Sequence, residues 1–134
     1  MFCNSQEKCL ELLDSLAKSG LACVAYHRGL NANQRMQVIQ DLQDGTANIM
    51  VSTDLAARGL DFQAVSLVVQ FEFALDGVSL IHRMGRTCRL GQKGRVISFL
   101  TESNLLLYEK FRETVQSEEH LDQIFSHKRS LSKN

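Results

Sequence analysis

The hydrophobic residues of this chain follow two patterns: short uninterrupted apolar runs, and longer segments in which apolar positions recur every three or four residues. The first pattern predicts buried β-strands and the second predicts amphipathic helices. The predicted strands cover residues 1–3, 21–26, 48–52, 65–71 and 96–100, and the predicted helices cover residues 5–19, 32–43, 78–87 and 104–115. Because nearly continuous apolar strands alternate with helices, we expect an α/β fold, a three-layer open parallel sheet with helices on both faces.

Polar residues mark the starts of the first two predicted helices. Ser5 and Asn31 carry oxygens that can accept a hydrogen bond from an unpaired N–H group of the first helical turn, so both are predicted N-caps. The inner and edge positions of the second helix are predicted at Met36, Ile39 and Leu42 or Gln43.

The composition is typical of a soluble globular chain, since 44 % of the 134 residues are hydrophobic and 22 % are charged. No apolar run approaches the roughly 20 residues that a membrane span needs, so we expect no membrane partner. None of the four cysteines forms a C-x-x-C pair, which argues against a metal site and favours small buried thiols in a reducing compartment. No signal peptide is visible, and we expect an intracellular protein.

The chain is expected to divide into a domain and a tail. We expect residues 1–116 to form one domain whose first strand is cut short, and residues 117–134 to form a partly disordered C-terminal extension. The extension contains one weak amphipathic turn and a basic end. A frayed tail is one interpretation of that end, and a contact with nucleic acid is the other.

Arginines cluster between residues 82 and 89 with no acid among them. Because the formal net charge is zero, any affinity for nucleic acid must come from such a local patch. If the segment is helical, its basic face carries His82, Arg86 and Arg89, and its apolar face carries Ile81, Met84, Gly85 and Cys88. Neighbouring cations repel by about 0.2–0.5 kcal/mol per pair, and a phosphate that accepts several guanidinium donors removes this repulsion. The alternatives are a solvated basic face and arginines paired with acids elsewhere in the fold.

The loop from Thr53 to Asp61 follows a predicted strand, at the end where open parallel sheets bind their ligands. It contains two carboxylates, Asp54 and Asp61, with Arg58 between them. Acid–base chemistry or a metal would need a histidine or a third acid nearby, which this loop lacks. Structural pairing with an arginine is one interpretation of the carboxylates, and a hydrogen bond from a ribose to Asp61 is another.

These segments resemble the motifs of one enzyme family. Residues 53–61 (TDLAARGLD) resemble motif V of the DEAD-box ATP-dependent RNA helicases, and residues 82–89 (HRMGRTCR) resemble motif VI. Shorter likenesses are those of residues 2–5 to the end of motif IV, of residues 27–30 with Arg35 to motif IVa, and of residues 68–72 to the strand after motif V. Two long motifs in the family's order, on a matching pattern of strands and helices, are strong grounds for the resemblance.

The resemblance implies a second RecA-like domain, the C-terminal lobe of a two-lobe motor that closes on ATP and on one RNA strand. It implies that Arg86 and Arg89 are arginine fingers for the γ-phosphate, that Gly59 and Asp61 bind ATP, and that His82 couples the ATP site to the RNA side. The RNA-binding residues that it implies are Asn4, Ser5, Gly29, Arg35, Thr53 and Arg58.

The same resemblance implies ATP with Mg²⁺ as cofactor, the ion being held mainly by a missing amino-terminal lobe. The implied partners are RNA, as a single strand or short duplex bound through its backbone, that RecA-like lobe, and protein cofactors. Because the sequence lacks both the G-x-x-x-x-G-K-S/T phosphate loop and the Asp-Glu-Ala-Asp motif, we expect this chain alone not to hydrolyse ATP. The alternatives are a non-catalytic scaffold of the same ancestry that binds RNA or protein, and a related helicase that acts on DNA.

The chain also departs from the family pattern. Cys88 replaces a glycine of motif VI, Ala32 replaces a glutamine, Arg28-Gly29 stands where Gly-Asp is usual, Ala74 replaces a common proline, and Gln6 replaces an often basic residue. We expect Cys88 to be tolerated because it is small, whereas Ala32 removes a polar contact near the RNA path.

Overall fold

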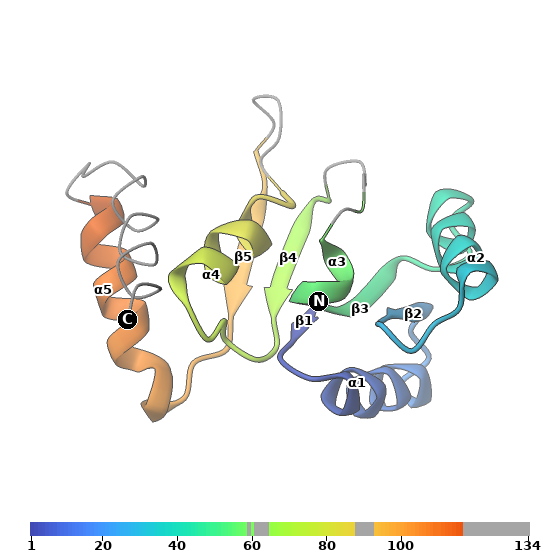
Figure 1. The fold of residues 1–134 in the computed structure, drawn as a ribbon, viewed down its shortest axis with the longest axis horizontal. Coiled ribbons are helices and arrows are strands. Elements are labelled where there is room, and N and C mark those ends of the chain that lie inside the picture. Colours follow the sequence, from blue (N-terminus) through green and yellow to red (C-terminus); the bar gives the residue numbers. More distant parts are fainter. Residues whose placement is uncertain (59, 61–64, 88–92, 117–134) are drawn as a thin grey trace, which may run out of the picture.

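The computed structural model describes residues 1–58, 60, 65–87 and 93–116, arranged around a central sheet (Figure 1). Its strands are β1 (Phe2–Cys3), β2 (Cys23–Tyr26), β3 (Ile49–Thr53), β4 (Leu67–Gln70) and β5 (Arg95–Ser98). They lie in the order β2-β3-β1-β4-β5, and each adjacent pair runs parallel. The predicted parallel α/β sheet is therefore confirmed.

Helices lie on both faces of this sheet, as predicted. The helices of the described residues are α1 (Gln6–Lys18), α2 (Ala32–Gln43), α3 (Asp54–Ala57), α4 (Gly77–Met84) and α5 (Glu102–Gln116). Parallel crossovers are right-handed, so α1, which leads from β1 toward β2, lies on the face opposite α3 and α4, whose crossovers run the other way across the sheet. In Figure 1 the β2–β3 end of the sheet runs between α1 and α2.

Two helices differ from the prediction. Residues 54–57, predicted as loop, form α3, because Asp54 suits the first turn of a helix and Leu-Ala-Ala are good helix formers. Helix α4 ends at Met84 instead of continuing to residue 87, with Gly85 as its C-cap. After Gly85, the N–H groups of Arg86 and Thr87 donate to carbonyls three residues earlier instead of four, so the last turn tightens and the α-helix stops.

Both predicted N-caps are confirmed. Ser5 Oγ accepts a hydrogen bond from the N–H group of Lys8 at 3.1 Å. Asn31 Oδ1 accepts from the N–H group of Gln34 at 2.9 Å, and Gln34 Oε1 accepts from the N–H group of Asn31 at 2.9 Å. This reciprocal pair is a capping box, which fixes the point where the chain turns from the β2–α2 loop into α2.

Apolar side chains form separate clusters on the two faces of the sheet. Under α1, the buried residues are Cys3, Cys9, Leu12 and Val51. The hydrogen bond of Cys3 with Cys9, together with burial, raises the pKa of the Cys3 thiol, so it stays neutral and packs as a small apolar group. The buried positions of Cys3 and Cys9 agree with the prediction, whereas the expected inward position of Met36 is wrong, because α2 buries Val38 and leaves Met36 70 % exposed.

Another cluster joins α4 to α5 at the β5 end of the molecule. Its buried residues are Phe73, Ala74 and Leu80, with Met84, Leu107, Tyr108 and Phe111 packed against them. Helix α5 is described up to Gln116, and the predicted extension of residues 117–134 lies outside the described residues. None of the helices that the structure describes has the length and apolar character needed to cross a bilayer.

Replacing Leu80 by alanine should lower the free energy of unfolding by about 2–5 kcal/mol, because the side chain is only 1 % exposed and its loss leaves a cavity between α4 and α5. Leu106→Ala is the matched control, because Leu106 is 63 % exposed on α5 and its loss should change stability by less than about 0.5 kcal/mol. Urea unfolding of the two variants beside the unmodified chain measures both values, and equal effects would contradict the assignment of Leu80 to the core.

Candidate functional site

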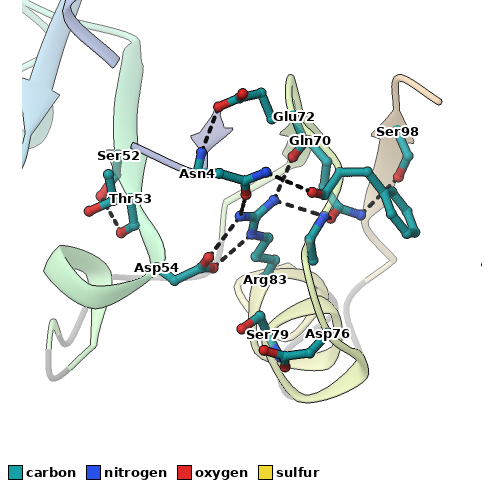
Figure 2. Close-up of polar contacts among 12 residues, drawn as sticks. Asn4, Ser52, Thr53, Asp54, Gln70, Glu72, Asp76, Ser79, Arg83 and Ser98 are labelled. Atoms are coloured by element: carbon teal, nitrogen blue, oxygen red, sulfur yellow. Dashed lines mark hydrogen bonds and ion pairs between the residues drawn. The ribbon is translucent and has the colours of Figure 1, made fainter. Parts of the chain in front are cut away.

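The carboxyl ends of the three central strands present polar residues at one edge of the sheet. The strand register places one row of residues opposite one another, Phe2, Ser52 and Gln70. Asn4, Asp54 and Glu72 each follow a member of this row by two positions and surround a single side chain from α4 (Figure 2). Ligands of open parallel sheets bind beyond such an edge.

That side chain is Arg83, which is 1 % exposed. Its Nε donates to Asp54 Oδ1 at 2.7 Å, and its Nη2 donates to Asp54 Oδ2 at 2.7 Å. This two-pronged ion pair joins α4 to the first residue of α3, and it uses the planar fork that distinguishes arginine from lysine.

The remaining N–H groups of Arg83 reach the ends of β1 and β4. Nη2 also donates to Asn4 Oδ1 at 2.7 Å, and Nη1 donates to the carbonyl of Glu72 at 2.6 Å and to Gln70 Oε1 at 3.5 Å. The guanidinium carbon lies 5.2 Å from the centre of the Phe2 ring. All five N–H donors of the buried cation therefore have an acceptor, which is the condition for burying a charge at tolerable cost.

A second set of hydrogen bonds holds the acceptors themselves (Figure 2). Asn4 donates from its backbone to the Glu72 carboxylate at 2.7 Å and from its side chain to the carbonyl of Phe73 at 3.0 Å. Gln70 donates from Nε2 to Ser98 Oγ at 2.8 Å, which extends the network to β5. We refer to Arg83, Asp54, Asn4, Gln70 and Glu72 as the Arg83 network.

The expected arrangement of the arginine helix is therefore wrong. The buried residues of α4 are Ser79, Leu80 and Arg83, not a purely apolar face with Ile81. Arg83, to which the sequence assigned no role, is as deeply buried as Leu80. Because α4 ends at Met84, Arg86 lies beyond it and does not share a helical face with His82. The sequence did contain a signal, since Arg83 follows Leu80 by three positions and so continues the inward side of the helix.

The structure also decides between interpretations of the loop acids. Asp54 pairs with Arg83 from elsewhere in the fold, while Arg58 is exposed. Structural pairing is thus correct for Asp54, although the partner is not the arginine inside the loop. Nowhere among the described residues do three or more histidine, cysteine or acidic side chains gather as metal ligands would.

A small pocket lies beside the Arg83 network, and Arg58, His82 and Arg86 line it together with Asp54 and Arg83. The pocket brings together residues of motifs V and VI as the sequence led us to expect. His82 and Arg58 are exposed, so both can meet a molecule that approaches this edge.

Arg86 also contacts the chain on either side of residues 61–64. Its Nη1 donates to the carbonyl of Leu60 at 2.9 Å, and its own carbonyl accepts from the N–H group of Val65 at 3.0 Å. Arg86 thereby contacts both ends of the segment that contains Asp61. The predicted positions Gly59, Asp61 and Arg89 lie outside the described residues.

The expected RNA-binding residues lie in and beside the loops that follow β1, β2 and β3, with Thr53 at the end of β3 and Arg35 in the first turns of α2. Thr53 pairs in register with Cys3, directly before Asn4, so the ends of β1 and β3 are neighbours. The β2–α2 loop packs against the start of α1, where a Cβ atom on Gly29 would lie 3.0 Å from Gln6 Nε2. The contact is tight, so a larger residue at position 29 would require the Gln6 or His27 side chain to shift by a few tenths of an ångström.

Three of these residues are engaged within the domain. Both ends of the Asn4 amide are hydrogen bonded, and Ser5 Oγ caps α1. Arg35 donates from Nη2 to the carbonyl of Arg28 at 3.1 Å and lies 6.0 Å from the centre of the Tyr26 ring. Thr53 makes no side-chain cap to α3.

Comparison with known proteins identifies the family. Residues 1–91 match the model of the helicase conserved C-terminal domain. The chain belongs to this family. Over 131 residues it is 39 % identical to DEAD-box ATP-dependent RNA helicase 22 of Arabidopsis thaliana, a match that covers 98 % of this chain and 22 % of the relative. Over 99 residues it is 40 % identical to ATP-dependent RNA helicase DbpA of Escherichia coli, covering 74 % of this chain and 22 % of that relative.

Solved structures support the same assignment. The E. coli DEAD-box protein SrmB, bound to regulator of ribonuclease activity A, has a TM-score of 0.76 and 34 % identity, over 82 % of this chain and 65 % of that chain. S. cerevisiae Dbp5, bound to RNA and ADP BeF3, has a TM-score of 0.75 and 27 % identity, over 84 % of this chain and 30 % of that chain. The DEAD-box resemblance and the RecA-like fold are confirmed, and the helicase C-terminal domain spans about a fifth of the length of its curated relatives.

Arg83→Met should lower the free energy of unfolding of this helicase domain by about 3–5 kcal/mol, because it leaves the Asp54 carboxylate facing the interior without its cation. Arg83→Lys should recover little of that loss, since an ammonium group cannot reproduce the fork. Adding Asp54→Asn to Arg83→Met should restore part of the stability. Urea unfolding measures the change in stability of each variant, and Arg112→Met, at an exposed position of α5, is the control. If Arg83→Met unfolds at the same urea concentration as the unmodified chain, the fold does not depend on the network.

Proposed function

We propose that this domain is the C-terminal lobe of an ATP-dependent RNA helicase and contributes arginine fingers to ATP hydrolysis and an RNA-binding edge to local duplex unwinding. The observation that carries the proposal is the Arg83 network, which ties the motif V turn at Asp54 to the motif VI helix α4. A scaffold that only binds RNA or protein has no need for a fixed relation between these two segments.

The ATP-facing residues in this proposal are Arg86 and Arg89, with Gly59 and Asp61 at the ribose side and His82 as the coupling residue. Phosphoryl transfer depends on positive charge placed where charge develops, and an arginine finger contributes about 10³–10⁵ in rate. The contact of Arg86 with Leu60 supports this role, because it places the motif VI arginine beside the loop that contains Asp61.

The proposed cofactor is ATP with Mg²⁺, and the two lobes would bind different parts of it. Each carboxylate oxygen of Asp54 accepts a hydrogen bond from Arg83, so the charge of this acid is paired within the domain. The Mg²⁺ ion, which offsets charge on the β- and γ-phosphates, would be held mainly by acids of the amino-terminal lobe.

The proposed RNA path follows the carboxyl edge past Asn4, Ser5, Gly29, Arg35, Thr53 and Arg58. Backbone N–H groups, hydroxyl groups and guanidinium groups suit phosphate and 2′-hydroxyl contacts, which bind RNA without choice of sequence. The solved complex of the relative Dbp5 with RNA supports this assignment. Protein cofactors are further proposed partners, supported by the complex of SrmB with regulator of ribonuclease activity A.

In the full-length protein, Arg89→Ala should abolish nearly all RNA-stimulated ATP hydrolysis while RNA affinity is largely kept, because the loss of one finger removes about 10³–10⁵ in rate. Steady-state phosphate release and RNA binding by fluorescence anisotropy provide the two measurements. Arg112→Ala on α5 is the control. Unchanged turnover in Arg89→Ala would remove the finger assignment.

The isolated 134-residue chain should show no RNA-stimulated ATPase activity, since its sequence contains no phosphate loop and no Asp-Glu-Ala-Asp motif. The measurement is phosphate release from a highly purified sample with and without RNA. Activity that co-purifies with the chain and disappears in its Arg89→Ala variant would contradict this expectation.

A further inference from the structure

The β2–α2 loop, residues 27–31, is held in one conformation by its own hydrogen bonds. The ring Nδ1 of the buried His27 accepts from the N–H group of Gly29 at 3.1 Å, and the carbonyl of His27 accepts from the N–H group of Leu30 at 3.2 Å. The Asn31 capping box then closes the loop onto α2. Arg28 lies at the turn of this loop, with its neighbours on both sides fixed.

Arg35 adds a further constraint from the first turns of α2. Its Nη2 donates to the carbonyl of Arg28 at 3.1 Å, its guanidinium lies against the Tyr26 ring, and its Nε is buried without a hydrogen-bond partner among the described atoms. Much of the Arg35 guanidinium is therefore directed at the main chain of the loop. In this geometry Arg35 acts as a support for Arg28.

The side chain of Arg28 is placed differently. It is exposed, and within the described part of the chain it makes neither a hydrogen bond nor an ion pair through its guanidinium. Residues 19–40 contain no aspartate or glutamate, so the local sequence offers no internal counter-ion. An exposed cation on a rigid turn, with no acid of its own segment, suits an external anion.

The position of the loop indicates which anion this is. Tyr26 lies in register with Ser52, which lies in register with Phe2, so Arg28 is two residues past the same row that Asn4 and Asp54 follow. Gly29 lies against Gln6 at the start of α1, next to Ser5. Arg28 is thus on the edge along which the RNA strand is proposed to run.

We propose that Arg28 binds a phosphate group of the RNA strand and that Arg35 is a positioning residue that holds the Arg28 main chain for this contact. The inference rests on the proposed RNA-binding function and adds a contact that the family resemblance does not supply, because Arg28-Gly29 stands where Gly-Asp is usual. Relative to that pattern the loop gains a cation and loses an acid, so this lobe binds the backbone with a stronger dependence on salt.

The test measures binding of a short oligouridylate to the full-length protein, with a non-hydrolysable ATP analogue, over a series of salt concentrations. Each phosphate contact to a single strand contributes about 0.7 to the slope of log affinity against log salt. Arg28→Ala should reduce the slope by about 0.7 and weaken binding about fivefold near 0.1 M salt, which is the same slope change expressed as affinity. Arg28→Lys should keep the slope, because it keeps the charge.

Two further variants separate the roles of the arginines. Arg35→Ala should also reduce the slope, through the loss of its own proposed contact and of the support that it gives to Arg28, so the double variant should lose less than the sum of the two single variants. Arg112→Ala, which removes an exposed arginine of α5 at the far end of the molecule (Figure 1), should leave the slope unchanged.

The outcomes that overturn the inference differ from those that overturn the proposed function. If Arg28→Ala leaves slope and affinity unchanged while Thr53→Val weakens binding, the RNA path stands and the Arg28 contact is refuted. A loss of affinity without a change in slope also refutes a phosphate contact. If the Arg28, Arg35 and Thr53 variants all bind RNA like the unmodified protein, the proposed RNA-binding edge itself is wrong.

Discussion

The buried guanidinium of Arg83 sets the geometry of the functional edge. Its five N–H groups find acceptors on the ends of β1, β3 and β4, so three strands and α4 are held to one centre. Such a cation is stable only when every donor is used, which makes the arrangement all or none. Because Asn4 on the proposed RNA side and Asp54 beside the proposed ATP site accept hydrogen bonds from the same guanidinium group, Arg83 directly connects the two.

The sequence predicted the framework of the fold well because that framework depends on local patterns. The apolar runs located all five strands, and Ser5 and Asn31 located the starts of α1 and α2, since a capping side chain acts on N–H groups only three residues away. The inward face of α2 was misjudged at Met36. Because this helix is only weakly amphipathic, the sequence pattern does not distinguish well between Met36 and Val38 as the buried position.

The site was predicted only in part. Residue types and order led to the correct family, and Asn4, Thr53, Arg58, His82 and Arg86 do lie at one edge. The central role of Arg83 was missed because periodicity treats arginine as an outward-facing residue, and because its partner Asp54 lies far away in the chain. A pairing of that kind depends on strand order, and the pattern of single residues does not determine strand order.

Strand β1 lies in the middle of the sheet and joins its two sides. Phe2 pairs with both Ser52 and Gln70, so the middle of the sheet is formed by residues that lie far apart along the chain. Closing such long loops is slow, and the contacts that reward it come late in folding. Without β1, the β2–β3 pair and the β4–β5 pair would share no hydrogen bonds between strands, so the pairing of β1 with both of its neighbours is what makes the described sheet continuous.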